Sequence, residues 1–298
     1  MPLLHRNIVV LGCAALLLIL GQAVASDAEQ MQGSWRPLAV FANDKPDQTE
    51  SHPGSHIDFA TDRMTWLDRD GKELLAGRFA LAESTEVKGK ATVTTQTIDL
   101  TTGSSTCPGI YDVYLPNVLR ITLRNLKPEL GRPGGHMGGG GGTFFLLERI
   151  TEQKPRPIDT SRPDQERLLG TWSMLMSFDD NSDKIRPGPW NGHVCVITKE
   201  RIEWRGSPKQ KGFSVGADYT IDPSTTPKQM DWQNAKGGNP PPPDDGFLPA
   251  IYEFIDEDTL KVCYPESGFK ATTPPKERAR PTRFQSDGNI NLWIMKRQ

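Results

Sequence analysis

The sequence is poor in cysteine, in excess charge and in long hydrophobic runs. Only 4 cysteines occur among 298 residues, which excludes a small scaffold held together by many disulfides. The formal net charge is −2, so the chain lacks the positive field that nucleic acid selects, and we predict no nucleic-acid partner. Hydrophobic residues make up 36% and charged residues 24%, a balance that supports a packed core and excludes a disordered polyelectrolyte.

The common motifs of catalysis and metal binding are also missing. No G-x-S-x-G, P-loop, H-E-x-x-H or C-x-x-C pattern occurs. His52 and His56 are separated by Pro53 and Gly54, which exclude a shared helical face, so we predict solvated loop histidines, with a loop metal site that includes Asp58 as the alternative. We therefore predict no catalytic residue, no metal and no cofactor, although a triad that assembles only in space stays open.

The longest apolar run lies within residues 1–25. Arg6 precedes it, residues 8–20 are apolar or small, and Ala23-Val24-Ala25 forms a small-residue cleavage site. This order is typical of a cleaved secretory signal peptide. As a helix the run would extend about 20 Å, short of a bilayer core of roughly 30 Å, so we predict no permanent membrane span after cleavage. The predicted location is periplasmic or extracellular, with an uncleaved anchor or lipidation at Cys13 as alternatives.

Removal of this segment leaves Cys107, Cys195 and Cys263. An odd number of cysteines in an oxidising compartment leaves at least one thiol without an intramolecular partner. Cys195 and Cys263 either bridge or remain isolated thiols in strands. Strand alternation places Cys263 on the polar face with Lys261, which favours a partly exposed thiol.

Residues after the signal segment contain two copies of one pattern. The offset between matched residues rises from 137 at Gly33 and Gly170 to 148 at Arg149 and Arg297, as loop insertions require. We predict copy one at residues 30–150, a proline-containing linker at 151–163 and copy two at 164–298. The paired segments are 31–35 with 168–172, 63–66 with 201–204, 109–112 with 250–253, 117–121 with 258–262, and 144–149 with 292–297.

Each copy is predicted to be all-β. Short runs of strand-forming residues alternate with turn residues, and neither copy shows a convincing amphipathic helix, which favours a sandwich or an antiparallel barrel. In copy two the predicted strands are Trp172–Phe178, His193–Thr198, Arg201–Trp204, Phe213–Ile221, Gln229–Trp232, Ala250–Ile255, Thr259–Tyr264, Thr282–Gln285 and Ile290–Met295.

Four aromatic residues recur at matching positions in the two copies. Trp66 matches Trp204, and Tyr111 matches Tyr252. If these side chains point inward, they are candidates to line a pocket for an apolar or planar ligand at a barrel mouth. Core packing is the alternative, because small barrels fill their interiors with side chains.

Two pairs of carboxylates also recur, Asp112 with Glu253 and Asp99 with Asp231. Alternation along the strands places Asp112 and Glu253 on the outer face, where Arg120 and Lys261 follow in the next strand. We predict that these groups are solvated surface charges.

A glycine and a tryptophan open the first strand of each copy, and an arginine closes the last strand, a pattern that resembles the lipocalin signature. The glycine permits a tight entry, the indole plugs one end, and the guanidinium stacks on it. More closely, the chain resembles an uncharacterised, planctomycete-enriched lipocalin-like repeat family, which copy two matches best through residues 280–284 (RPTRF), whereas copy one has a glycine run there. The resemblance implies two tandem lipocalin-like barrels in an exported protein, and it brings no reaction. The barrel-closing residues are Gly33, Trp35, Arg149, Gly170, Trp172 and Arg297.

These observations predict an exported, non-catalytic protein that binds a small apolar ligand or an envelope protein. The alternative is a structural or protein-interaction module in which both barrels are solid. A hydrolase with a site between the barrels is the third hypothesis. The lining of the two barrel interiors distinguishes the first two.

Overall fold

The computed structural model describes most of the two repeats. The described residues are 27–42, 54–88, 91–115, 117–124, 128–133, 142–151, 155–178, 193–206, 214–237, 247–265, 279–284 and 290–298. The predicted signal segment, His52 and most of the glycine run lie outside these residues.

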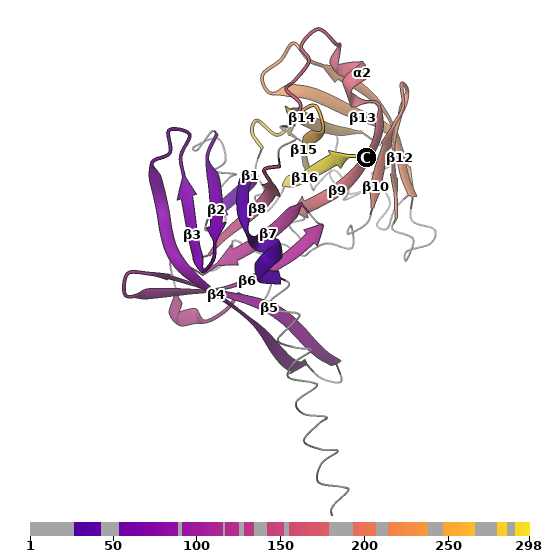
Figure 1. Cartoon of the computed structure of the whole chain (residues 1–298). Helices are drawn as coiled ribbons and strands as arrows, with labels where there is room; N and C mark the ends of the chain where they lie inside the picture. The colour runs from indigo at the N-terminus through magenta and orange to yellow at the C-terminus, as the bar shows by residue number, and fades with distance from the viewer. Residues whose placement is uncertain are drawn as a thin grey trace, which may run out of the picture.

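The chain folds into two closed antiparallel barrels in tandem (Figure 1), which confirms the predicted all-β fold class. In each barrel every strand pairs with the next one along the chain, and the last strand pairs with the first. Barrel one comprises β1 (Gly33–Ala42), β2 (His56–Ala60), β3 (Arg63–Leu67), β4 (Glu73–Lys88), β5 (Ala91–Thr102), β6 (Ser105–Leu115), β7 (Val118–Leu123) and β8 (Thr143–Arg149).

Barrel two repeats this order. A single α-helical turn, α2 (Asp164–Leu168), precedes it, and the 3-10 turn η2 (Pro128–Leu130) lies between β7 and β8 of barrel one. The strands of barrel two are β9 (Gly170–Phe178), β10 (Val194–Ile197), β11 (Arg201–Arg205), β12 (Ser214–Asp222), β13 (Lys228–Gly237), β14 (Leu248–Asp256), β15 (Thr259–Pro265) and β16 (Ile290–Arg297).

Two predictions about local structure were wrong. Residues 282–284, within the predicted strand Thr282–Gln285, form bends and pair with no strand. Short helices were also missed, because α2 and the helical residues 27–31 are each about one turn long and too short to show a helical hydrophobic period.

The interior of each barrel is filled by alternate side chains from its strands. In barrel one the interior includes Trp35, Ile57, Tyr111 and Phe145, and in barrel two it is more aromatic. Barrel two buries Trp172, Trp204, Tyr219, Trp232, Tyr252, Phe254, Tyr264 and Trp293 in one cluster.

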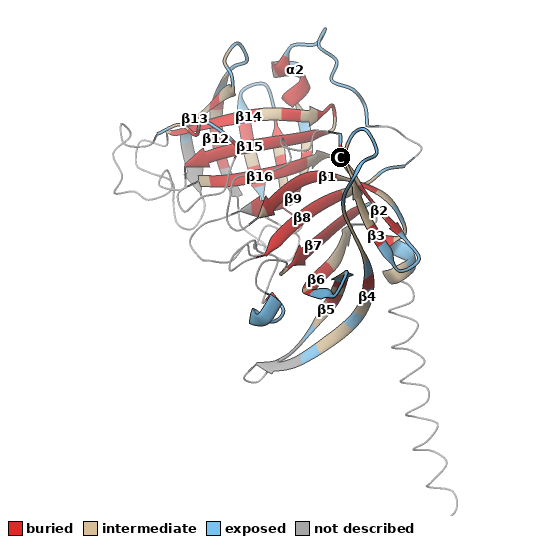
Figure 2. Cartoon of the chain, turned by 90° about the vertical axis from the view of Figure 1, so that its left-hand side faces the viewer, coloured by how far each residue is buried: buried red, intermediate tan, exposed pale blue. Residues whose placement is uncertain are grey.

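A third apolar cluster lies between the barrels and joins their outer faces. Strands β7, β8, β9 and β16 lie together in the middle of the molecule and are buried (Figure 2). Strand β15 also contributes to this cluster, through Cys263. Because both of their faces are covered, β7 and β15 are buried along their whole length. The cluster comprises Leu38, Ala39, Phe41, Val118, Phe144, Leu146, Leu175, Met176, Ile251, Cys263, Phe284, Leu292 and Ile294.

This contact between the barrels overturns the predicted exposure of three residues. Cys263 is fully buried, and Arg120 and Lys261 are about as well covered, with 4% and 3% of their surface exposed. Alternation identified the outer face correctly, but here the outer face of one barrel packs on the other barrel.

Polar side chains border the same contact. The Arg36 guanidinium of barrel one binds Glu148 of its own barrel and Asp256 of barrel two. Lys296 of barrel two reaches back to Glu148, with 2.6 Å between Nζ and Oε1. These ion pairs cross between the two repeats and orient them at one edge of the apolar cluster.

Candidate functional site

The same arrangement of residues closes one end of each barrel. A helical turn precedes the first strand, and its first residue, Asp27 or Asp164, accepts a hydrogen bond from an inward tyrosine. The distance from the tyrosine hydroxyl to the carboxylate is 3.1 Å for Tyr111 and 2.7 Å for Tyr252. Burial is the main cause that raises the pKa of both tyrosines, and the neighbouring carboxylate adds to it.

The six residues of the barrel-closing signature meet at these ends. The guanidinium carbon of Arg149 lies 4.2 Å from the ring centre of Trp35, and Arg297 lies at the same distance from Trp172. The arginines also donate to main-chain oxygens of the helical turn, for example from Arg297 Nη1 to Leu169 O at 2.6 Å. Each guanidinium therefore ties the last strand to the start of the first.

Glycine is required where the first strands begin. Gly33 and Gly170 have φ values of +109° and +132°, which disfavour any side chain. A Cβ atom at Gly170 would also lie only 2.9 Å from Arg297 Nη1, and one at Gly33 would lie 3.1 Å from Arg149 Nη1.

The recurring carboxylates are ion-paired, which corrects their prediction as solvated surface charges. Asp112 binds the buried Arg120, and Glu253 lies 3.3 Å from the Nζ atom of Lys261. The partners are arginine in one copy and lysine in the other, at matching positions on β7 and β15.

The second carboxylate pair reveals a repeat that was missed in the sequence. Arg132 binds Asp99 and the carbonyl oxygen of Gly109, and Arg280 binds Asp231 and the carbonyl oxygen of Ala250 in the same way. The prolines that follow, Pro133 and Pro281, are both buried. Copy one therefore keeps the Arg-Pro pair. The two pairs are 148 residues apart, which is also the offset between Arg149 and Arg297 in the last strands, and this equal spacing was the signal in the sequence.

The four candidate ligand-lining residues are packed among core side chains. Tyr111, Trp204 and Tyr252 are at most 3% exposed, whereas Trp66 is half-buried and lies edge-on to Phe145, with ring centres 5.5 Å apart. In barrel two the rings of Trp204, Trp232, Trp293 and Tyr264 lie 4.7–5.7 Å from one another, so they fill the space that a ligand would need. This packing is the one that the solid-barrel alternative predicts.

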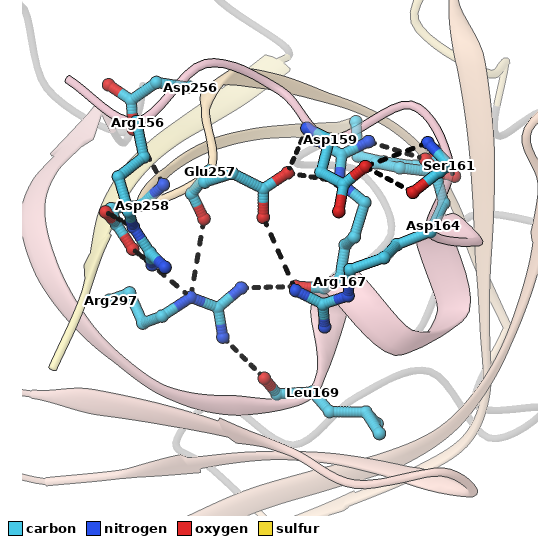
Figure 3. A network of polar contacts seen from close by, with 12 residues as sticks. Arg156, Asp159, Ser161, Asp164, Arg167, Leu169, Asp256, Glu257, Asp258 and Arg297 are labelled. Carbon is cyan, nitrogen blue, oxygen red and sulfur yellow. Dashed lines mark hydrogen bonds and ion pairs between the residues drawn. The ribbon is translucent and has the colours of Figure 1, made fainter.

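A network of charged groups lies at the closed end of barrel two (Figure 3) and has no counterpart among the described residues of barrel one. Arg167 donates from Nε to Glu257 at 2.9 Å and from Nη1 to Asp164 at 3.0 Å. Its side chain is 2% exposed, and its guanidinium carbon lies 4.0 Å from the ring centre of Phe254. Asp164 also accepts from Lys228 Nζ at 2.7 Å, so this one carboxylate binds two cations and the tyrosine hydroxyl described above.

The network continues to the surface through the turn between β14 and β15. Arg156 binds Asp258 in two contacts, and the hydrogen bond from Arg156 is the main cause that lowers the pKa of Asp258. Glu257 also accepts the main-chain N–H of Asp159, at 2.7 Å. The segment before α2, predicted as a linker, therefore lies against barrel two.

A pocket opens beside this network. Its volume is about 350 Å³, and Arg167, Lys228 and Tyr252 form its polar wall on the side of the network. The other lining residues are Ile158, Pro223, Ser224, Thr225, Thr226, Pro227, Glu253, Phe254 and Phe284. Two cationic residues, one carboxylate, hydroxyl-bearing residues and apolar surface thus line one space.

The remaining candidates form no further site in the part of the chain that the structure describes. His56 lies 3.7 Å from Asp58, and no group of three or more metal-binding side chains occurs among the described residues. Cys107, Cys195 and Cys263 are all free thiols and buried, so Cys195 and Cys263 do not bridge. None of the described helices is long and apolar enough to span a membrane.

Comparison with known proteins identifies no family. No protein-family model matches the chain, and no curated protein matches it in sequence. Among solved structures, a protein of unknown function from the DUF3598 family of Nostoc punctiforme is 10% identical, with 90% of this chain and 97% of that chain covered and a TM-score of 0.21. A candidate outer membrane protein from Bacteroides fragilis is 8% identical, with 91% and 99% covered and a TM-score of 0.24. The fold assignment therefore rests on the strand pairing of the chain itself.

Proposed function

We propose that this chain is an exported, non-catalytic binding protein whose ligand site lies outside the barrels, in the pocket at the closed end of barrel two. The pocket of about 350 Å³ beside a buried arginine is the observation that carries this proposal. Ligand sites in proteins are concave and mostly apolar, with a few polar groups that fix orientation, and this pocket has that composition. Export is supported by the signal-like segment at residues 1–25.

Comparison of the two repeats supports the choice of this site. Barrel one closes its end with the same tryptophan, arginine and aspartate–tyrosine contacts, so closure alone does not need further charges. Arg167, Lys228 and Glu257 correspond in copy one to Gln30, Gln96 and Pro116. These paired charges therefore occur at one barrel end, although closure of the other end does without them, which favours a function of their own.

Because side chains fill both barrel interiors, we place the proposed ligand outside them. The sequence predicted an apolar ligand between the recurring aromatics, but these rings pack against other core side chains, such as Phe145, Trp232 and Phe254. In our proposal the apolar part of the ligand packs on the pocket wall formed by Ile158, Phe254 and Phe284.

A ligand screen with a pocket-filling variant tests the proposal. Saturation-transfer NMR of the purified full chain against a library of small soluble compounds is repeated with Thr226→Trp, since Thr226 is an exposed residue of the pocket wall. Ser105→Trp adds an indole at an exposed strand start of barrel one and is the matched control. We expect compounds whose signals vanish only with Thr226→Trp. A screen in which no compound distinguishes the two variants would refute the proposal.

A second function, as a protein-interaction module, is favoured by the solid barrel interiors. The apolar cluster between the barrels is already covered within the chain, so a protein partner would bind elsewhere. Pull-down of one envelope protein by wild type and equally by Thr226→Trp would support this alternative.

A further inference from the structure

The pocket at the closed end of barrel two is lined by two cations, Arg167 and Lys228, and by one carboxylate, Glu253. The nearby carboxylate of Asp164 already accepts from both cations: Oδ1 accepts from Arg167, and Oδ2 accepts from both Lys228 and Tyr252. Glu257 Oε1 likewise accepts from Arg167 and from the main chain of Asp159. These contacts leave some donor hydrogens of the two cations unused.

One of those donors is buried. The Nη2 atom of Arg167 is inaccessible to solvent and has no hydrogen-bond partner in the described part of the chain. A buried donor without a partner costs about 1–3 kcal/mol, and more when it is charged. An acceptor that reaches Nη2, after a shift of the side chains that cover this atom, would recover this free energy.

The second cation is accessible. Lys228 has a side chain 36% exposed, and its hydrogen bond to Asp164 uses one of three ammonium hydrogens. The hydroxyl-bearing residues Ser224, Thr225 and Thr226 line the same pocket. The Lys228 ammonium group therefore provides an accessible donor in the pocket that the buried Arg167 also lines.

Resting on the proposed function, we infer that the ligand of this pocket is a small carboxylate with an apolar or aromatic tail. A carboxylate is planar and has two acceptor oxygens, which suits a guanidinium edge and an ammonium group together. Its tail would pack on Phe254, which already lies under the Arg167 guanidinium, and on Ile158. The site is specific to barrel two, because copy one has Gln30 and Gln96 at the positions of the two cations.

Matched pairs of ligands test this inference on the full chain. Benzoate is compared with benzamide, and hexanoate with hexanamide, so that each pair differs mainly in charge and acceptor number. Binding is measured by calorimetry, and its location by amide shift changes at residues 223–228. We expect each acid to bind at least about tenfold more tightly than its amide, as a charged hydrogen bond predicts, with the shifts confined to the pocket.

Substitutions identify the groups that hold the carboxylate. We expect Lys228→Met to weaken benzoate binding by about tenfold, while Lys199→Met, at an exposed lysine outside the pocket, leaves it unchanged. Arg167→Gln restores the residue of copy one and should abolish binding. If Arg167→Gln does not fold, the pair of lysine variants still decides the question.

The alternative outcomes separate the two proposals. Amides that bind as tightly as the acids, with shifts at residues 223–228, would overturn the carboxylate assignment and leave the proposed function intact. Phenyl phosphate that binds there more tightly than benzoate would also overturn it, in favour of a phosphate ligand. If neither acid nor amide perturbs these residues and the screen of the proposed function also finds no compound, both proposals fail.

Discussion

Replacement of Arg297 by methionine tests whether the guanidinium closes barrel two. The substitution keeps the aliphatic packing on Trp172 and removes the charged group. Arg297 Nη1 donates to Leu169 O at 2.6 Å, Nη2 donates to Arg167 O, and the guanidinium carbon lies 4.2 Å from the Trp172 ring centre. Charge-assisted hydrogen bonds contribute about 1.5–3 kcal/mol each and a cation–π contact about 0.5–2 kcal/mol.

The net loss is expected to lie near the lower end of this sum. The Arg297 side chain is 20% exposed, and burial lowers its pKa, so part of the gain is offset by the removal of the charge from water. We expect Arg297→Met to lower the free energy of unfolding of barrel two by about 3 kcal/mol, which corresponds to roughly 10 °C in Tm.

Urea unfolding followed by tryptophan fluorescence measures this loss. Five of the seven tryptophans belong to residues 164–298, so the signal reports mainly on barrel two. Arg149→Met is the matched control in barrel one, where one of the two acceptor residues, Gln30, is exposed to water, and a smaller loss is expected. A loss below about 1 kcal/mol for Arg297→Met would refute the reasoning, because the charged hydrogen bonds would then contribute nothing.

Three further predictions follow from other contacts. Tyr252→Phe should destabilise the protein by about 1 kcal/mol and Tyr111→Phe by less, because the Tyr252 hydrogen bond is shorter and buried. Chemical denaturation of both variants measures the two losses, and a larger loss for Tyr111→Phe would contradict this prediction. Cys195 is fully buried in an apolar core, and this burial raises the pKa of its thiol. A thiol reagent should therefore label Cys195 only as fast as the protein unfolds, and rapid labelling of the native protein would contradict this burial. The pKa of Asp258 is lowered by Arg156, so this carboxylate stabilises the fold above its unfolded pKa of about 3.9, and the contribution disappears as pH falls through the lower folded value. Unfolding of Asp258→Asn should therefore depend less on pH between about pH 5 and pH 2 than wild type, and equal slopes would exclude this ion pair as the cause.

Much of the architecture was readable from local patterns. Alternation correctly placed Tyr252 and Phe254 on the inward face, and the repeat indicated two similar domains. The arginine, tryptophan and glycine at each closed end could be named in advance because they recur at matched ends of the first and last strands. The prediction of a strand at Thr282–Gln285 was wrong. Residues with high strand propensity form a strand only where a neighbouring strand is free to pair with them, and the local composition does not reveal whether one is.

Local sequence patterns could not predict the candidate site. Arg167 and Glu257 are 90 residues apart in sequence, and neither belongs to a periodic pattern that marks it as buried. The apolar runs in β8 and β16, Phe144–Leu147 and Leu292–Met295, did contain a signal, because unbroken apolar runs are typical of strands that are covered on both faces.

By itself, the sequence determined the low charge, the signal-like start, the duplication and the all-β class, since each depends on composition or on contacts between neighbouring strands. Only the tertiary structure decided that the recurring aromatics pack against other core side chains, that the outer faces of the barrels bury Cys263, and that a buried arginine lies beside a pocket in one copy. Those outcomes depend on which faces meet in space, and strand period alone leaves that choice open. The low net charge and the missing catalytic motifs thus accompany a cluster of paired charged groups at one end of barrel two.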